Sequence, residues 1–558
     1  MKFKNLFVYL SFVIVINVNA QWSTNYENNL RISNWSRLPL SATSDGNGGV
    51  YIAINRDITI NDTIPGSYSY LFRLDKYGYN KWSEPIHIGL EDWQHDVALI
   101  EDGSGGVIAC IRDLDFIRWS DGGHWIWDYK ISLQRIDSLG NKLWGDGIFV
   151  CTDTTDQYEF DICTDGNGGC YVSWLSEKTM DYIYSDGYRA IQHISASGER
   201  MWSDTGKVLY TGGVVQLDEL WNKIKPNNAG GIYTINTPNL NDFYYISISV
   251  NGDILWELRS RFTNVPNEFF SNNEGGVFAF SLERGGGYEY KNFEMDRIAE
   301  NGEYIWDDKK TFVDLVGDRS RIIDLYFNDD SSASIYWIDM DGSGNYVSYY
   351  QLIDKNGGLQ FNGNGITPSE EYPNQNWADR MIKSDDDYII LYIDDQLKAH
   401  KLTQNGESVW TEDVVFSTMG ASDRRYISDK NGGFIYTFIE GLNGLWAQQV
   451  SSNGNLGEVI TNIIFNKSIL PKTFKLSQNY PNPFNPRTTI NYSISKSGFV
   501  QLTVYDVLGR DVAKLVNEHQ KNGKYSVQFN ASNLPSGVYF YKIVSGSFSK
   551  VNKMLLLR

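Results

Sequence analysis

Residues 102–111 read Asp-Gly-Ser-Gly-Gly-Val-Ile-Ala-Cys-Ile, a polar turn that ends in two glycines and leads directly into an apolar strand. Glycine tolerates the positive φ that tight hairpin turns require, so the pattern predicts one strand on each side of the turn. The same signature returns along the chain, which indicates an internal repeat. Clear copies begin at Asp45, Asp165, Asn227, Asn272 and Asp429, and degenerate copies lie at Asp329–Asp330 and Asp385–Asp387.

A second signature follows each copy and consists of a strand, a short turn with glycine, and a strand that begins with an aromatic residue. Ile136, Gly140 and Trp144 show the spacing. Because the tryptophan returns at the same place, we interpret it as a core residue between neighbouring units rather than as a ligand contact. Further copies are Gly78/Trp82, Gly198/Trp202, Gly252/Trp256, Gly302/Trp306 and Gly406/Trp410, while Phe361 replaces tryptophan once and Gly454 lacks an aromatic partner.

Eight units recur with a period of roughly 45–62 residues, and each unit is expected to form four antiparallel strands. Four-stranded sheets repeated in this way are the blades of a β-propeller. We therefore expect an all-β protein with an eight-bladed propeller, and a seven-bladed ring is the alternative. Residues 21–33 resemble a fourth strand with its tryptophan, Trp22, so we expect the N-terminal strand to complete the last unit.

Long connections between second and third strands are expected at the end of the sheets opposite the glycine turns. The connection Arg112–Tyr129 is the richest in aromatic residues and carries Trp119, Trp125 and Trp127. Tryptophan beside polar groups suits stacking on sugar rings or a protein hot spot, so these three residues are the candidate ligand-binding residues. The alternative is that the three rings form a small local core.

The chain of 558 residues carries a formal net charge of −19, which disfavours binding to nucleic acid or to an anionic membrane surface. Residues 1–20 resemble a secretory signal peptide, with Lys2 and Lys4, an apolar stretch Leu6–Ile16, and the small-residue site that ends at Ala20. We expect passage through the Sec pathway. No later stretch is apolar enough to cross a membrane, so no transmembrane segment is expected in the mature chain.

Candidate metal, redox and catalytic residues are few. Cys163 and Cys170 flank one glycine turn, which predicts either a disulfide across a hairpin or two free buried thiols. The spacing of Asp339, Asp341 and Ser343 resembles the start of a calcium loop, but Tyr350 stands where a bidentate glutamate is needed, which favours a polar turn. We therefore expect no metal or cofactor, with calcium as the alternative, and no motif of a known catalytic class marks a reaction.

Composition changes near residue 470, and four of the 13 prolines lie within Pro471–Pro486. Alternating strands follow, and they predict a small immunoglobulin-like β-sandwich. We therefore divide the chain into a signal peptide (1–20), a propeller (21–466), a proline-rich linker and lead-in (467–486) and a sandwich (487–558).

The run Leu476–Ile490 resembles the opening of the type A C-terminal sorting domain of the type IX secretion system, as do Val504–Arg510, Leu534–Tyr541 and Lys553–Arg558. The resemblance implies transfer across an outer membrane by the type IX machinery, followed by removal of the domain with release or surface attachment. The motif residues that carry it are Tyr480, Pro481, Asn482, Pro483, Phe484, Asn485, Pro486, Gly509, Gly537 and Lys553.

The leading functional prediction is a non-enzymatic binding protein, secreted or held at the cell surface, with a glycan or a protein as its ligand. It follows from the aromatic connection and from the lack of a catalytic motif. An extracellular glycan-degrading hydrolase or lyase and a structural component of a surface layer are the alternatives.

Overall fold

The computed structural model describes residues 22–557 apart from 178–186, 212–222, 313–320, 368–376, 458–473 and breaks of five residues or fewer. The described residues form strands, turns and irregular segments and contain no helix. The signal peptide predicted at residues 1–20 lies outside them. The chain divides into two compact units, Met1–Glu458 and Val459–Arg558, and each is described by itself.

One sheet of the first unit shows how the repeat folds. β10 (Asp156–Thr164), β11 (Cys170–Glu177), β12 (Tyr188–Ile194) and β13 (Lys207–Thr211) pair antiparallel in chain order. The Gly-Gly turn joins the first two strands, and its Asp165 carboxylate accepts hydrogen bonds from the backbone N–H groups of Asn167 (2.7 Å) and Gly169 (2.8 Å). This Asx-type turn explains why an aspartate or asparagine precedes the glycines in each clear copy.

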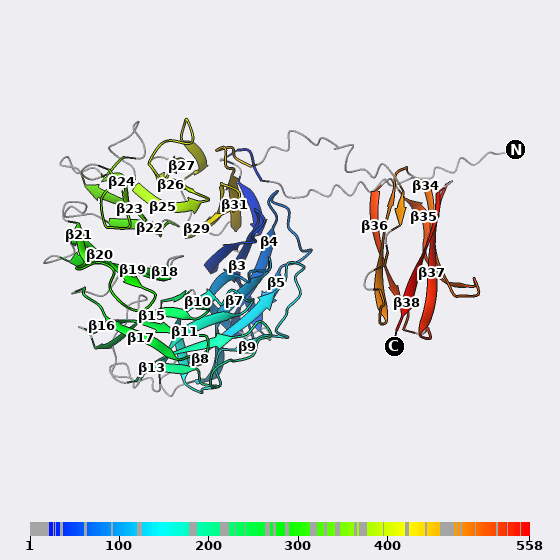
Figure 1. The fold of residues 1–558 in the computed structure, drawn as a ribbon, viewed down its shortest axis with the longest axis horizontal. Helices are drawn as coiled ribbons and strands as arrows, with labels where there is room; N and C mark the ends of the chain where they lie inside the picture. Colours follow the sequence, from blue (N-terminus) through cyan, green and yellow to red (C-terminus); the bar gives the residue numbers. More distant parts are fainter. Residues whose placement is uncertain are drawn as a thin grey trace. The chain divides into compact units, whose positions relative to one another are not determined.

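The other sheets of the first unit repeat this order, except that one has three described strands, and Figure 1 shows them following one another along the chain. A single parallel residue pair, Ser67 with Trp93, joins the first two sheets. The strands are β2 (Arg37–Ser44), β3 (Val50–Ile60), β4 (Ile64–Leu74) and β5 (Ile86–Ile88); β6 (Trp93–Glu101), β7 (Val107–Trp119), β8 (Trp125–Ile136) and β9 (Ile148–Phe149); β14 (Ile224–Pro226), β15 (Ile232–Asn239), β16 (Asp242–Ile248) and β17 (Ile254–Arg259); β18 (Glu268–Ser271), β19 (Gly276–Arg284), β20 (Tyr290–Ala299) and β21 (Lys310–Phe312); β22 (Arg321–Phe327), β23 (Ala333–Met340) and β24 (Tyr346–Ile353); β25 (Trp377–Ser384), β26 (Asp387–Ile393), β27 (Gln396–Thr403) and β28 (Val414–Thr418).

The last sheet of this unit takes a strand from the beginning of the chain. β29 (Asp423–Ser428), β30 (Phe434–Ile439) and β31 (Leu445–Val450) pair in order, and β1 (Leu30–Ser33) pairs antiparallel with β31. The prediction that an N-terminal strand completes the last unit is confirmed by this pairing.

Hydrophobic clusters fill the spaces between neighbouring sheets. Ile108 of β7 packs with Val172 of β11, and Phe278 of β19 packs with Ile335 of β23. The last sheet packs on the first in the same way, because Ile435 of β30 and Ile52 of β3 share one cluster. The core of this unit therefore lies between sheets, and a central strand such as β12 is buried along its whole length.

The repeated tryptophan links each sheet to the next, as predicted. Trp144 donates a hydrogen bond from Nε1 to the carbonyl oxygen of Ala196 at 3.0 Å, and its ring lies against Gly198 of the following glycine turn. A Cβ on Gly198 would lie 2.8 Å from Trp144 Cδ1, so glycine is required for this contact as well as for its φ of +86°. Trp22 makes the equivalent bond to the carbonyl oxygen of Lys76 at 2.8 Å, between the chain start and the first sheet.

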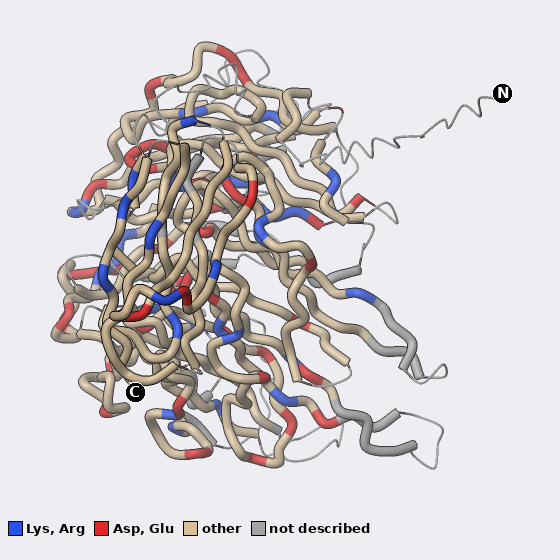
Figure 2. Tube along the Cα trace, turned by 90° about the vertical axis from the view of Figure 1, so that its right-hand side faces the viewer, with Lys and Arg blue, Asp and Glu red and all other residues tan. Residues whose placement is uncertain are grey.

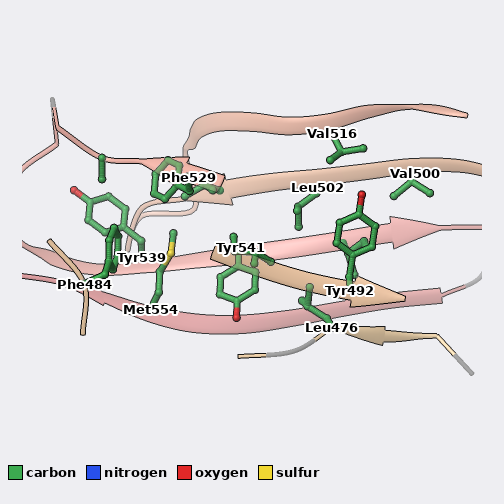
Figure 3. Packing of buried hydrophobic residues seen from close by; sticks show 14 of the residues in the cluster. Leu476, Phe484, Tyr492, Val500, Leu502, Val516, Phe529, Tyr539, Tyr541 and Met554 are labelled. Carbon is green, nitrogen blue, oxygen red and sulfur yellow. The ribbon is translucent and has the colours of Figure 1, made fainter. Parts of the chain in front are cut away.

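The C-terminal unit has two sheets that enclose one core (Figure 3). Leu502 and Tyr541 from one sheet and Ile490 and Phe529 from the other are buried between them. The first sheet has the order β35 (Asp511–Gln520), β34 (Gly498–Tyr505), β37 (Gly537–Ser545), β38 (Phe548–Leu556), and the second has the order β32 (Lys475–Leu476), β33 (Arg487–Ile494), β36 (Gly523–Asn530).

Candidate functional site

The segment predicted as a long connection, Arg112–Tyr129, is largely a β-hairpin, and that part of the prediction was wrong. β7 continues to Trp119 and β8 begins at Trp125, and these two residues are cross-strand partners. The arms contain β-branched and aromatic residues at facing positions, for example Phe116 opposite Trp127, and such pairs stabilise a hairpin.

The backbone of the hairpin contains all three candidate tryptophans. Trp119 ends β7 and is the cross-strand partner of Trp125, the first residue of β8, while Trp127 pairs with Phe116. Further along β8, Ile131 packs against the sheet of β10–β13.

Two tyrosines meet where β8 reaches the next sheet. The rings of Tyr129 on β8 and Tyr158 on β10 lie 4.9 Å apart between centroids, tilted by 40°, and both side chains are half-buried. The backbone N–H of Tyr129 donates a hydrogen bond to Asp156 Oδ1 at 3.0 Å, which fixes the start of β10 against β8. The guanidinium of Arg112 lies 5.8 Å from the centroid of the Tyr129 ring.

Arg112 also reaches a histidine–aspartate pair on β6. Its Nη2 lies 2.5 Å from Asp96 Oδ2, while His95 Nδ1 lies 2.9 Å from Asp96 Oδ1. The His95 side chain is 56% exposed, so this group is open to solvent. His95, Asp96, Arg112, Tyr129, Asp156 and Tyr158 form what we call the hairpin-base cluster.

The two carboxyl groups of the cluster differ in acidity. Burial alone would raise the pKa of Asp96, but the hydrogen bond from His95 and the positive charge of Arg112 outweigh it and hold the pKa below its ordinary value. Burial raises the pKa of Asp156, and the nearby charge of Asp128 adds to the effect despite the hydrogen bond from the Tyr129 backbone.

A lysine beside the cluster holds the connection that leads into β10. Lys130 Nζ lies 3.1 Å from Asp128 Oδ1 and donates hydrogen bonds to the carbonyl oxygens of Asp153 (3.1 Å) and Thr155 (3.0 Å). These contacts tie β8 to the segment that positions Asp156.

Sequence reasoning predicted the tryptophans of the hairpin as ligand contacts and did not identify the hairpin-base cluster. His95, Asp96, Asp156 and Tyr158 come from β6 and β10, and no spacing along the chain brings them together with β8. The one available signal was the alternation of Trp125, Trp127 and Tyr129, which predicts a strand with an aromatic face.

Of the two alternatives predicted for Cys163 and Cys170, a disulfide or two free buried thiols, the structure has the free thiols. Cys163 pairs with Tyr171 and Cys170 pairs with Thr164, so the two cysteines are not cross-strand partners. Cys163 faces the cluster with Ile224, whereas Cys170 faces the opposite cluster with Ile108. The predicted Cys163–Cys170 disulfide is therefore not formed, and all four cysteines are free and buried.

The predicted calcium residues are only partly described. Asp339 lies in β23, while Asp341 and Ser343 lie outside the described residues. Within the part of the chain that the structure describes, no group of three or more His, Cys, Asp or Glu side chains could hold a metal ion.

The lead-in motif of the C-terminal unit packs against the last strand of the chain. Phe484 is 2% exposed in the core, and its backbone exchanges hydrogen bonds with Leu555 (2.9 Å) and Leu557 (3.0 Å). Asn482 Oδ1 accepts a hydrogen bond from the backbone N–H of Leu555 at 2.9 Å. Tyr480 and Pro481 lie outside the described residues, while Asn485 is exposed and Pro486 accepts a hydrogen bond from Ala531.

Two glycines of the motif stand at turns, and the lysine stands on β38. Gly509 (φ +77°) closes the turn between β34 and β35, where Asp506 Oδ1 accepts hydrogen bonds from the N–H groups of Leu508 (2.9 Å) and Arg510 (3.0 Å). Gly537 begins β37. The carbonyl of Lys553 accepts a hydrogen bond from Gln478 at 2.7 Å, which joins the two ends of the domain.

The family comparison decides the nature of this unit. Residues 478–557 match the model of the secretion system C-terminal sorting domain. These residues belong to the sorting-domain family. The match confirms the resemblance and supports a type IX secretion cargo protein, and the sorting domain implies recognition by the type IX machinery and export across the outer membrane.

Among solved structures, similar chains share little sequence with this one. PorZ, a bacterial surface component of the type IX secretion system of Porphyromonas gingivalis, is 9% identical, with 96% of this chain and 100% of PorZ covered and a TM-score of 0.23. Prolyl oligopeptidase B from Galerina marginata is 12% identical over 69% of this chain and 56% of its own, with a TM-score of 0.36. A family 43 arabinoxylan arabinofuranohydrolase from Bacillus subtilis is 8% identical over 94% and 97%, with a TM-score of 0.24.

The search of curated proteins found no match. The described residues include no helix with the length and apolar character needed to span a bilayer. Along the traces in Figure 2, Lys and Arg are interspersed with Asp and Glu.

Proposed function

We propose that this protein is a non-enzymatic binding protein, exported to the cell surface or the medium, with a glycan or protein ligand. The hairpin-base cluster is the observation that carries the proposal. It places two half-buried tyrosines, a half-exposed histidine and an arginine at the base of a hairpin whose strands contain three tryptophans. Aromatic rings with a few polar groups at their edge are typical of recognition sites.

The scaffold in this proposal is a closed eight-bladed propeller. The pairing of β1 with β31 and the cluster shared by the last and first sheets support a closed ring. In a propeller, connections between second and third strands gather at one end of the blades, and that end commonly carries the ligand site. The β7–β8 hairpin is such a connection, and Trp119, Trp125 and Trp127 remain the proposed ligand contacts on it.

Export in this proposal starts with the Sec pathway through residues 1–20 and ends with the type IX machinery, which reads the sorting domain. Replacing Lys2 and Lys4 with glutamate should hold the precursor in the cytoplasm. Export of this variant at the normal rate would contradict the assignment of the leader.

The test of function is an array of glycans and of surface proteins probed with the full-length exported chain. Binding without a change in ligand mass supports the proposal. Simultaneous substitution of Trp119, Trp125 and Trp127 with alanine should then abolish binding. Unchanged binding would show that the hairpin is not part of the binding site. If no member of the array binds, the proposed function is wrong.

A glycan-degrading hydrolase or lyase is the second candidate, and one observation favours it. The pKa of Asp156 is raised while that of Asp96 is lowered, and acid–base catalysis by two carboxyl groups needs such a difference. Release of shortened oligosaccharides, lost on Asp156→Asn, would establish this activity. If the bound array ligands keep their mass after long incubation, hydrolase and lyase activity are excluded.

A further inference from the structure

The charges around the hairpin-base cluster limit the kind of ligand that it can take. Arg112 contacts Asp96 at 2.5 Å, and Lys130 contacts Asp128 at 3.1 Å. Both cations of the described site thus already have a carboxylate partner. A sulfated, phosphorylated or carboxylated ligand would have to displace one of these carboxylates, in a chain whose net charge is −19.

A cationic ligand is disfavoured for a related reason. The negative charge of Asp96 is matched by Arg112, and that of Asp128 by Lys130. Asp156 accepts a hydrogen bond from the Tyr129 backbone, and burial raises its pKa, which weakens its hold on a cation. The site is therefore rich in polar groups but nearly balanced in charge.

Hydrogen-bonding groups and aromatic surface occur together in the cluster. The carboxylates of Asp96 and Asp156 accept hydrogen bonds, while Arg112 donates them. The tilted rings of Tyr129 and Tyr158 supply an apolar surface at the same place.

We infer that the hairpin-base cluster is a binding site for uncharged glycans, with Tyr158 and Tyr129 packing on the apolar face of a sugar ring and Asp156, Asp96 and Arg112 bonding to its hydroxyl groups. A sugar ring has both an apolar C–H face and hydroxyls that donate and accept, so it matches both halves of the site. The inference rests on the proposed binding function and names its ligand class.

The test measures binding of the full-length chain to three probe sets: neutral oligosaccharides (cello-, xylo- and manno-oligosaccharides), oligogalacturonate as the acidic counterpart, and oligolysine as the cationic one. We expect a neutral oligosaccharide to bind best, with little dependence on salt. Tyr158→Ala should weaken that binding roughly tenfold, the order of one lost aromatic contact. Tyr79→Ala, which alters a half-buried tyrosine in a glycine turn of the first sheet, is the matched control and should bind normally.

Tyr158→Phe separates a loss of ring contact from a loss of folding. It keeps the ring and removes the hydroxyl, which makes a long hydrogen bond of 3.4 Å to Asp156, so binding should stay within about twofold of the unsubstituted chain. If Tyr158→Ala binds as well as the unsubstituted chain, the hairpin-base cluster is not the binding site, although the proposed binding function still stands. Preference for oligogalacturonate or oligolysine would overturn the ligand class, and failure of every array ligand would overturn the proposed function itself.

Discussion

Asp296 of β20 is a carboxyl group whose ionisation should control the stability of the first unit. Its side chain is 1% exposed, and Oδ2 has no hydrogen-bond partner among the described residues. Burial raises the pKa to about 7, and the charge of Asp308 adds to it, while the Arg297 N–H and Arg261, 3.9 Å away, offset it only in part.

The sign of the pH effect follows from this shift. Between about pH 4 and pH 7 the folded chain keeps the Asp296 proton that the unfolded chain has released, so the free energy of unfolding falls as the pH rises. A shift of about three pH units is equivalent to about 4 kcal/mol. Asp296→Asn carries no charge at any pH, so it should match the unsubstituted chain near pH 4 and be more stable by up to about 4 kcal/mol at pH 8.

Urea unfolding followed by tryptophan fluorescence is suited to this measurement. All 17 tryptophans precede residue 459, so the signal comes from the first unit alone. Asp253→Asn, at an exposed position in a glycine turn, is the matched control and should leave the pH profile unchanged. The reasoning is refuted if the difference between Asp296→Asn and the unsubstituted chain is the same at pH 4 and pH 8.

Three further predictions concern the glycine turns and the sorting domain. Gly103→Ala and Gly302→Ala both place a side chain at a φ near +80°, which costs about 1–2 kcal/mol, but only a Cβ on Gly302 meets a neighbour, Trp256 Cγ at 2.6 Å. Gly302→Ala should therefore cost about 1–3 kcal/mol more in urea unfolding, and equal costs would contradict the packing role of the tryptophan. Phe484→Ala should cost the sorting domain about 3–5 kcal/mol and abolish export, whereas Asn517→Ala, at an exposed position of β35 outside the motif, should be exported normally. Immunoblots of medium and cell fractions distinguish the two, and normal export of Phe484→Ala would show that the lead-in is dispensable. Deletion of residues 470–558 should leave the chain in the periplasm of a host with the type IX system, and its arrival outside the cell would disprove the role of the sorting domain.

The repeat could be predicted from the sequence because each turn depends on chemistry local to it. Asp165 accepts hydrogen bonds from residues two and four positions later, and Gly198 is needed both for its φ and for contact with Trp144. Such requirements leave the same residue types in most of the units. The pairing of β1 with β31 could be predicted for the same reason, since Trp22 is the aromatic residue that the last unit lacks.

Features that depend on register or on distant segments could not be predicted. Thr164 pairs with Cys170, and this one-residue offset turns Cys163 to the other face of the sheet, which the turn sequence alone does not reveal. The hairpin-base cluster joins β6, β7, β8 and β10, so its members meet only after two sheets have packed together. The extent of β7 and β8 was missed because the aromatic residues of a binding connection are also good strand formers.

The pairing of β1 with β31 has a consequence for how the chain reaches its folded state. Leu30 lies opposite Ala447, so the first strand to be synthesised must wait for nearly the whole first unit before its partner exists. Until then β1 and β31 each offer an unpaired edge, and an unpaired edge accepts a strand from any chain of matching sequence. At high concentration the β1 strand of one copy could complete the last sheet of another, which is the geometry of a domain-swapped dimer.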